Sequence, residues 1–176
     1  MASNDSIVIL PNNASGPATI FATLDTITGG NSTAAVLTTV LDFAADASEY
    51  ADFKIALFPS YSGGGLTVTI IFSMTSDATE ATSGVRWEVA FRRINDDAEE
   101  IDATTDHTYA FNGVTAMVPS EIGEVSYDDI TFTDGADMDS LAAGEMAILR
   151  IYRDHDHADD DASGDAELHM IIVKET

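Results

Sequence analysis

The residues with the clearest potential for chemistry form one acidic, histidine-containing run near the end of the chain. It reads Asp154-His-Asp-His-Ala-Asp-Asp-Asp-Ala-Ser-Gly-Asp-Ala-Glu167. Oxygen-rich loops of this kind suit calcium, because a divalent ion relieves the repulsion between carboxylates. The carboxylates that could share one ion are those of Asp154, Asp156, Asp159 and Asp161. The spacing is not that of an EF-hand, which has a ligand where Ala158 stands and a glycine where Asp159 stands. We favour a solvated loop between the last two strands.

Other catalytic or metal-binding patterns are missing from the sequence. His155 and His157 are two residues apart and would share a face of an extended segment, but no well-spaced third ligand accompanies them and His169. There is no cysteine, no Gly-x-Ser-x-Gly and no His-Glu-x-x-His, and the Gly63–Gly65 run precedes a strand instead of a helix. We therefore predict no catalytic residue, no metal and no cofactor, and a protein that is not an enzyme.

Two aromatic residues are candidates for binding. Trp87 shares one face of its segment with Val89 and Phe91, which predicts a place in the core instead of a sugar-stacking role. Tyr61 stands beside three glycines and is the better candidate for an exposed aromatic that stacks on a sugar or docks on a partner. A mobile loop tip is nevertheless the default interpretation of Tyr61.

The elements that carry these residues are strands. Apolar and polar residues alternate over 66–72, 85–92, 147–153 and 168–172, as expected for strands with one buried face. Turn residues separate these segments at intervals typical of an all-β, antiparallel sandwich with a jelly-roll-like fold. We expect a helical turn over 46–52 and a short turn over 138–144. Further strands are expected at 6–10, 18–24, 36–43, 53–57, 107–111, 114–118 and 124–132.

The first 33 residues differ in composition from the rest. They contain Pro11 and Pro17 and are rich in Asn, Ser, Thr and Gly. We interpret residues 1–33 as an extended N-terminal arm that adds a strand to a neighbour, and 34–176 as the sandwich domain. Edge strands of the same domain would carry the same sequence pattern, so that alternative stays open.

The net charge limits the partners. The chain has 31 acidic and 7 basic residues, a formal net charge of -24, yet 45% of its residues are hydrophobic, so it can bury a core. An acidic surface repels phosphate backbones and anionic membranes. We therefore expect no direct contact with nucleic acid or with a membrane. The first residues also have no basic segment before an apolar one, so we expect no signal peptide.

Several segments resemble a family of small jelly-roll structural proteins of environmental and marine tailed phages. They are Gly64-Gly-Leu-Thr-Val-Thr-Ile-Ile-Phe, Ser83-Gly-Val-Arg-Trp-Glu-Val-Ala-Phe, Ser140-Leu-Ala-Ala-Gly-Glu, Leu149-Arg-Ile-Tyr-Arg-Asp and Gly164-Asp-Ala-Glu-Leu. The resemblance covers about residues 36–175 and contains no catalytic motif. It implies a jelly roll, a place in the virion and a homotrimer.

The resemblance leads to two functional hypotheses. The first is a capsid decoration (cement) protein on the outside of a phage head, with the major capsid protein and further copies of itself as partners. The second is a receptor-binding or carbohydrate-binding domain of a phage fibre, in which Tyr61 and the acidic loop would matter. The acidic net charge is compatible with the first hypothesis, because an acidic protein does not bind DNA during assembly.

Overall fold

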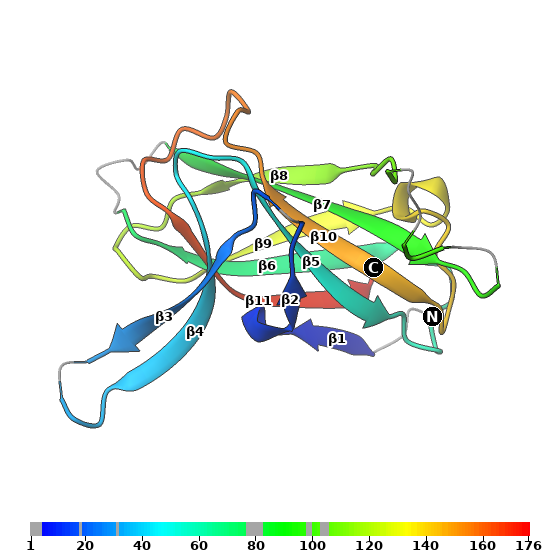
Figure 1. Cartoon of the computed structure of the whole chain (residues 1–176), viewed down its shortest axis with the longest axis horizontal. Helices are drawn as coiled ribbons and strands as arrows, with labels where there is room; N and C mark the ends of the chain where they lie inside the picture. Colours follow the sequence, from blue (N-terminus) through cyan, green and yellow to red (C-terminus); the bar gives the residue numbers. More distant parts are fainter. Residues whose placement is uncertain (1–4, 18, 31, 77–82, 98–99, 103–105) are drawn as a thin grey trace.

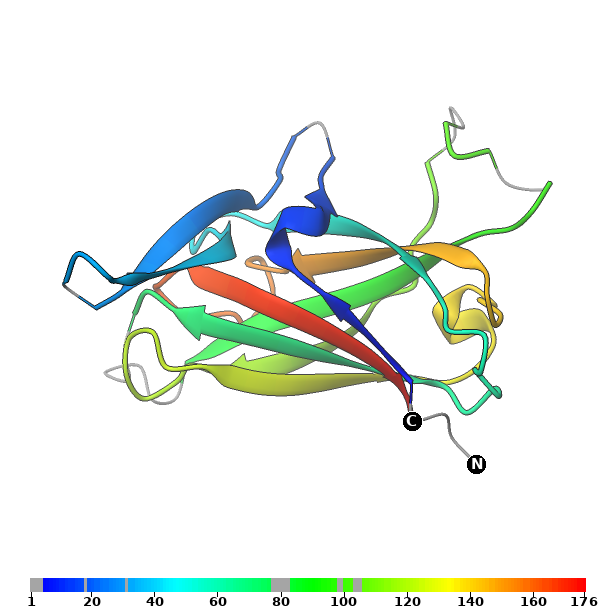
Figure 2. The same cartoon turned by 90° about the horizontal axis from the view of Figure 1, so that it is seen from below.

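The computed structural model describes all residues except 1–4, 18, 31, 77–82, 98–99 and 103–105. Its described strands form two antiparallel sheets packed face to face (Figures 1 and 2). The six-stranded sheet has the order β3-β4-β11-β6-β9, and β1 pairs with β11 as well. The strands of this sheet are β1 (Ser6–Ile9), β3 (Thr23–Gly29), β4 (Val36–Phe43), β6 (Leu66–Met74), β9 (Ser126–Phe132) and β11 (Ala166–Glu175).

The five-stranded sheet has the order β2-β5-β10-β7-β8. Its strands are β2 (Ala14–Ser15), β5 (Glu49–Ala56), β7 (Gly84–Ile94), β8 (Asn112–Met117) and β10 (Met146–Arg153). Two short 3-10 turns, η1 (Pro11–Asn13) and η3 (Ala136–Met138), lie in connections. Neither is long or apolar enough to span a membrane, nor is any other helix in the described part of the chain. The all-β sandwich expected from the alternation is confirmed.

The core lies between the two sheets and is built from their inward-facing residues. Trp87 is fully buried and makes edge-to-face contacts with Phe43 and Phe72, with ring centroids 5.0 and 5.5 Å apart. Phe91 packs in the same way on Phe132 at 4.9 Å. Such contacts add to the roughly 1.5–3 kcal/mol that burying each large side chain contributes. The predicted core role of Trp87 is confirmed.

A buried ion pair links the acidic loop, residues 154–167, to this core. Arg153 ends β10 with an inward-facing, fully buried side chain, and its Nη2 and Nε lie 2.8 and 3.0 Å from the two carboxylate oxygens of Asp160. The guanidinium also donates to the backbone carbonyls of Phe43, Gly164 and Ala162. A buried charge needs this degree of pairing, because isolated charges are costly to remove from water.

Three local expectations are wrong. Residues 46–52 do not form a helical turn, because β5 begins at Glu49 and pairs with β10. Residues 107–111 form no strand; their aromatic side chains pack on neighbouring rings instead. Of the strand expected at 18–24, residue 18 lies outside the described residues and β3 begins at Thr23; between them Phe21 forms an isolated bridge with Tyr50.

The N-terminal residues take part in both sheets of their own chain. β1 pairs with β11, β2 with β5, and β3 with β4. The β3–β4 hairpin spans the boundary expected at residue 33 and projects well beyond the sandwich (Figures 1 and 2). Contact of residues 1–33 with a neighbouring molecule stays a prediction.

Candidate functional site

Two tyrosines stack on the outer face of the five-stranded sheet. Tyr50 of β5 and Tyr152 of β10 are directly opposite each other in the strand register. Their rings lie 4.2 Å apart between centroids and are within 4° of parallel. Side chains alternate along a strand, so both tyrosines point away from the core because their neighbours Ala51 and Ile151 point into it. Both rings are partly exposed.

An ion pair lies beside the stacked rings. Arg150 and Asp52 form the next outward-facing pair in the same register. The Nε and Nη2 atoms of Arg150 are each 2.7 Å from one carboxylate oxygen of Asp52. This two-point contact raises the pKa of Arg150 above its usual value, chiefly through the hydrogen bond to Asp52. The Arg150 guanidinium carbon also lies 5.2 Å from the centre of the Tyr50 ring.

The connection between β7 and β8 supplies further aromatic side chains. The Arg150 guanidinium carbon lies 4.2 Å from the centre of the Tyr109 ring, and burial raises the pKa of Tyr109. Phe111 lies 5.8 Å from Tyr152 and 5.9 Å from Tyr109 between ring centroids. We call the side chains of Tyr50, Asp52, Tyr109, Phe111, Arg150 and Tyr152 the tyrosine platform. In Figure 2 the β7–β8 connection rises from one flank of this face and the segment before β3 from another.

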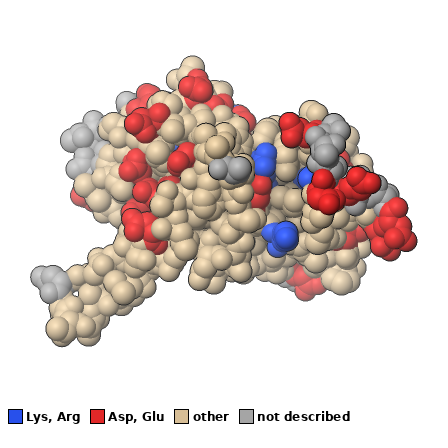
Figure 3. Space-filling model, in the orientation of Figure 1, with Lys and Arg blue, Asp and Glu red and all other residues tan. Residues whose placement is uncertain are grey.

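Basic side chains gather around the tyrosine platform although the whole chain is strongly acidic. Lys54, Arg86 and Arg92 occupy outward-facing positions on β5 and β7, so with Arg150 this face holds four of the seven basic residues. Figure 3 shows blue side chains over the region of β5, β7 and β10. Arg86 pairs with Glu88 at 3.2 Å. The face therefore combines aromatic surface with fixed donors and acceptors, a combination suited to binding polar ligands.

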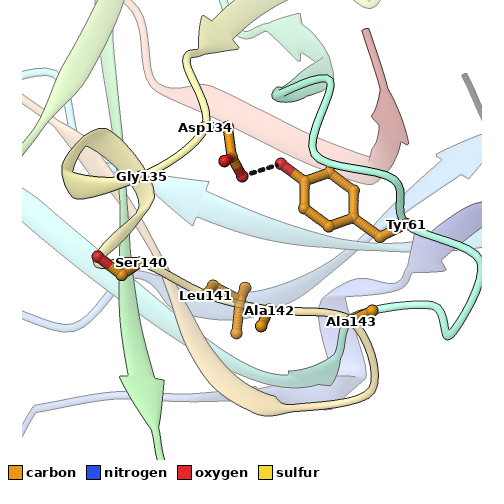
Figure 4. Close-up of a pocket in the computed structure, with 7 residues that line it drawn as sticks. All are labelled: Tyr61, Asp134, Gly135, Ser140, Leu141, Ala142 and Ala143. Atoms are coloured by element: carbon orange, nitrogen blue, oxygen red, sulfur yellow. Dashed lines mark hydrogen bonds between the residues drawn. The ribbon is translucent and has the colours of Figure 1, made fainter.

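Tyr61, the tyrosine singled out from the sequence, does not belong to the platform and instead lines a separate pocket (Figure 4). Its hydroxyl donates to Asp134 Oδ1 at 2.6 Å and accepts from the Gly65 amide at 3.1 Å. Burial and the bond to Asp134 raise the pKa of Tyr61 to about 12. Tyr61 is partly buried and packs on Phe58, so the expectations of an exposed aromatic and of a mobile loop tip are both wrong.

The pocket beside Tyr61 has a volume of about 320 Å³. Its remaining wall consists of small or apolar residues: Gly135, Ser140, Leu141, Ala142 and Ala143. Ser140 and the preceding Asp139 have φ angles of 55° and 53°, in the left-handed region that non-glycine residues seldom adopt. The pocket offers few free polar groups, because the Tyr61 hydroxyl and Asp134 Oδ1 already bond to each other.

The acidic loop does not gather its carboxylates around a common point. Asp160 pairs with Arg153, Asp161 accepts from the Gly84 amide at 2.8 Å, and Asp154 accepts from the Tyr152 hydroxyl at 2.9 Å. Among the described residues no group of three or more His, Asp or Glu side chains could hold a metal ion. The calcium hypothesis for Asp154, Asp156, Asp159 and Asp161 therefore finds no site in the described chain.

The histidines are likewise separated from one another. His157 Nδ1 accepts from the Asp159 amide at 3.1 Å in the acidic loop. His169 lies on β11, where its Nε2 is 2.8 Å from Ser73 Oγ and burial lowers its pKa. A site combining His155, His157 and His169 is therefore not formed.

The tyrosine platform was not predicted from the sequence, although part of its signal is visible there. The alternation that places Arg150 outside also places Tyr152 outside. The position of Tyr50 was hidden by the expectation of a helical turn at 46–52. Tyr109 and Phe111 fell in a segment expected to be a strand, where their packing on Arg150 and Tyr152 could not be foreseen.

The sequence matches no family model, and a search of curated proteins finds no relative. Solved structures do resemble the fold. A family 35 carbohydrate-binding module from an environmental isolate has a TM-score of 0.51 at 12% identity, over 95% of this chain and 91% of that one. The C-terminal CBM6 of a marine laminarinase from Zobellia galactanivorans has a TM-score of 0.48 at 8% identity, over 97% and 99%. A CBM35 from Cellvibrio japonicus has a TM-score of 0.47 at 9% identity, over 96% and 92%.

At these identities the likeness establishes the fold alone. The TM-score with the family 35 module supports a jelly-roll-like sandwich over nearly the whole length of both chains. All three of these structures are carbohydrate-binding modules.

Proposed function

We propose that this protein is a non-catalytic carbohydrate-binding module and that the tyrosine platform is its ligand site. The observation that carries the proposal is the stacked Tyr50–Tyr152 pair beside the Arg150–Asp52 ion pair on an outer sheet face. The family 35 carbohydrate-binding module of similar fold supports it. Of the two hypotheses raised by the sequence, the comparisons favour the carbohydrate-binding alternative.

The chemistry of the platform suits a sugar. A pyranose ring has an apolar face of C–H groups and a rim of hydroxyls, so it needs aromatic surface and hydrogen-bonding groups side by side. Tyr50, Tyr152 and Phe111 supply the aromatic surface, while the oxygen atoms of Asp52 and the guanidinium of Arg150 supply the polar groups. These groups are held in place by the strand register and by their mutual contacts, which limits the entropy lost on binding.

The charge distribution indicates the class of glycan. Arg150 is already neutralised by Asp52, and the chain as a whole carries a charge of -24. Long-range repulsion therefore acts against uronate-rich or sulfated polysaccharides. We propose a neutral glycan as the ligand.

The experiment is a glycan array with neutral and uronate-containing members, followed by calorimetric titration of the best ligand. Tyr50→Ala should weaken binding by about tenfold or more, equivalent to about 1.4 kcal/mol. Tyr127→Ala is the matched control, because Tyr127 is 67% exposed on the outer face of the other sheet. Equal losses in both variants, or no glycan bound by the wild-type chain, would contradict the proposal.

Capsid decoration, with the major capsid protein as partner and the virion exterior as location, stays a prediction. A fibre domain that binds glycans would satisfy both the resemblance to phage proteins and the tyrosine platform. Mixing the chain with undecorated expanded capsids tests the decoration hypothesis independently of any sugar.

A further inference from the structure

The β3–β4 hairpin leaves the body of the molecule. Only the last residues of β4 are attached to the six-stranded sheet, where Leu41–Phe43 pair with residues 166–168 of β11. Beyond this point β3 and β4 pair with each other alone among the described strands. Figures 1 and 2 both show the hairpin extending past the end of the sandwich. Its outer part therefore has no second sheet packed against it.

The projecting part exposes large apolar side chains. Leu24, Val36 and Leu37 are 51%, 65% and 69% exposed. Leu24 lies opposite Leu41, and Leu37 lies opposite Thr28, so these two leucines belong to the face that would point inward in the sandwich. Val36 lies on the other face. A protruding two-stranded ribbon with exposed apolar residues on both faces is unusual for a monomeric protein.

The same part of the chain carries no charge. Residues 26–41 include no Asp, Glu, Lys or Arg, in a chain with a net charge of -24, and Asp25 and Asp42 mark the limits of this segment. In Figure 3 the projecting hairpin shows no red or blue side chains, whereas the body shows many red ones. Electrostatic repulsion between two copies is therefore weakest where their hairpins meet.

The outer edge of β3 provides a template for pairing, although the Thr26 amide at its centre already donates to Asp25 Oδ1 at 2.6 Å. Pairing of this edge would replace that bond with one to the partner strand. β3 ends the strand order of its sheet and pairs only with β4 in the described chain. Edge strands of monomeric proteins are commonly protected by lysine, proline or a bulge. β3 has the sequence Thr-Leu-Asp-Thr-Ile-Thr-Gly, and its register with β4 is regular over all seven residues. Its one charged residue, Asp25, then restricts which register a partner strand can adopt.

We propose that two copies of this chain associate through antiparallel pairing of their β3 strands, on a twofold axis at Thr26. In this register Asp25 of one copy lies opposite Ile27 of the other, so the two Asp25 carboxylates are not opposed. Leu24 of one copy lies opposite Thr28 of the other, whose neighbour across the hairpin is Leu37. The leucines of both copies then share one face of a four-stranded ribbon.

A second copy fits this surface better than another kind of partner. A cationic protein would be attracted to the acidic body instead of to the uncharged hairpin. A second copy meets the hairpin without opposing charges, and the projection of the hairpin keeps the two acidic bodies apart. The inference is independent of the proposed sugar site, which lies on the outer face of the other sheet.

Sedimentation equilibrium of the full chain, at up to about 100 µM protein and in about 0.5 M sodium chloride, tests the proposal. The wild-type chain should be a dimer. Thr26→Lys should be a monomer, because it places two lysines opposite each other on the axis. If only the net charge mattered, Thr26→Lys would strengthen the dimer, since an added lysine lowers the net repulsion between two acidic chains.

Thr131→Lys is the matched control, with the same change at an exposed position on β9, the opposite edge strand of the same sheet. It should remain a dimer. Circular dichroism is used to check that each variant is folded. A folded wild-type chain that stays monomeric, or an oligomer that Thr26→Lys leaves intact, would overturn the proposal.

Discussion

The two outer faces of the sandwich use their side chains differently. On the six-stranded sheet, short polar side chains bond to one another: Thr69 donates to Asp129 at 2.5 Å, and Ser73 donates to Glu167 at 2.8 Å. On the five-stranded sheet, the outward positions of β5 and β10 hold stacked tyrosines and an arginine packed over aromatic rings. The stacked tyrosine rings are partly exposed, so aromatic surface stays available to a ligand on this face. Both faces are polar in sequence, but the described part of the five-stranded sheet combines stacked aromatic rings with an arginine packed over them.

The largest expected effect comes from breaking the buried Arg153–Asp160 ion pair, which lies in the core beneath both faces. Asp160→Asn takes away the charge that neutralises Arg153 in the core and should destabilise the chain by about 3–5 kcal/mol. Urea unfolding at neutral pH measures this change. Asp156→Asn, at an exposed position of the same loop, should change the free energy of unfolding by less than about 0.5 kcal/mol. Similar values for the two variants would mean that the buried pair does not support the fold.

The second prediction alters the tyrosine platform without removing a ring. Asp52→Asn leaves the Arg150 guanidinium without its charged partner. Affinity for a neutral glycan should fall several-fold, because Arg150 loses the contact that fixes its position. Affinity for a uronate-containing analogue should rise, because the positive charge is now free. Calorimetric titration of both ligands against wild-type and variant chains measures the change, and parallel losses for both would argue against Arg150 as a ligand contact.

The third prediction compares the platform with the Tyr61 pocket. Tyr61→Phe removes the hydroxyl that bonds to Asp134 and the Gly65 amide, and should cost about 1 kcal/mol of stability. Glycan affinity should not change. A tenfold loss of glycan binding in a folded Tyr61→Phe chain would mean that the ligand binds in the Tyr61 pocket and not on the platform.

The last prediction concerns the charge of the six-stranded sheet. Burial, followed by repulsion from Asp165, Glu167, Asp25 and Glu49, raises the pKa of Asp42 to about 6. The folded state therefore favours the protonated form, so this contribution to stability is complete below pH about 4 and is lost as the pH rises through about 6. Asp42→Asn should raise the melting temperature at pH 7.5 and have little effect at pH 4.5. A rise in melting temperature of equal size at both pH values would mean that the effect comes from packing and not from the charge of Asp42.

The fold was largely predictable because burial imposes a period of two on each strand. The strand expected at 36–43 has the bounds of β4, and Trp87, Val89 and Phe91 all lie in the core as expected. Predictions failed where tertiary contacts override local preference. Asp52 favours a turn by its residue type, but in β5 its carboxylate is held by Arg150.

The candidate site was less predictable, since its parts come from distant segments. The sequence pointed to Tyr61 because of the neighbouring glycines, and to the acidic loop because of its carboxylates. The structure directs the Tyr61 hydroxyl to Asp134 and one of the loop carboxylates to Arg153. The tyrosines that stack on each other belong to β5 and β10, and nothing in either segment alone identifies the other as its partner.

By itself, the sequence determined which side chains face the core, that the surface is strongly acidic, and that the segment from 26 to 41 is uncharged. Only the tertiary structure decided that Tyr50 lies opposite Tyr152 and that the uncharged segment projects from the body as a hairpin. The physical reason is that alternation fixes the face on which a side chain lies, whereas strand order and register depend on packing of the whole sheet.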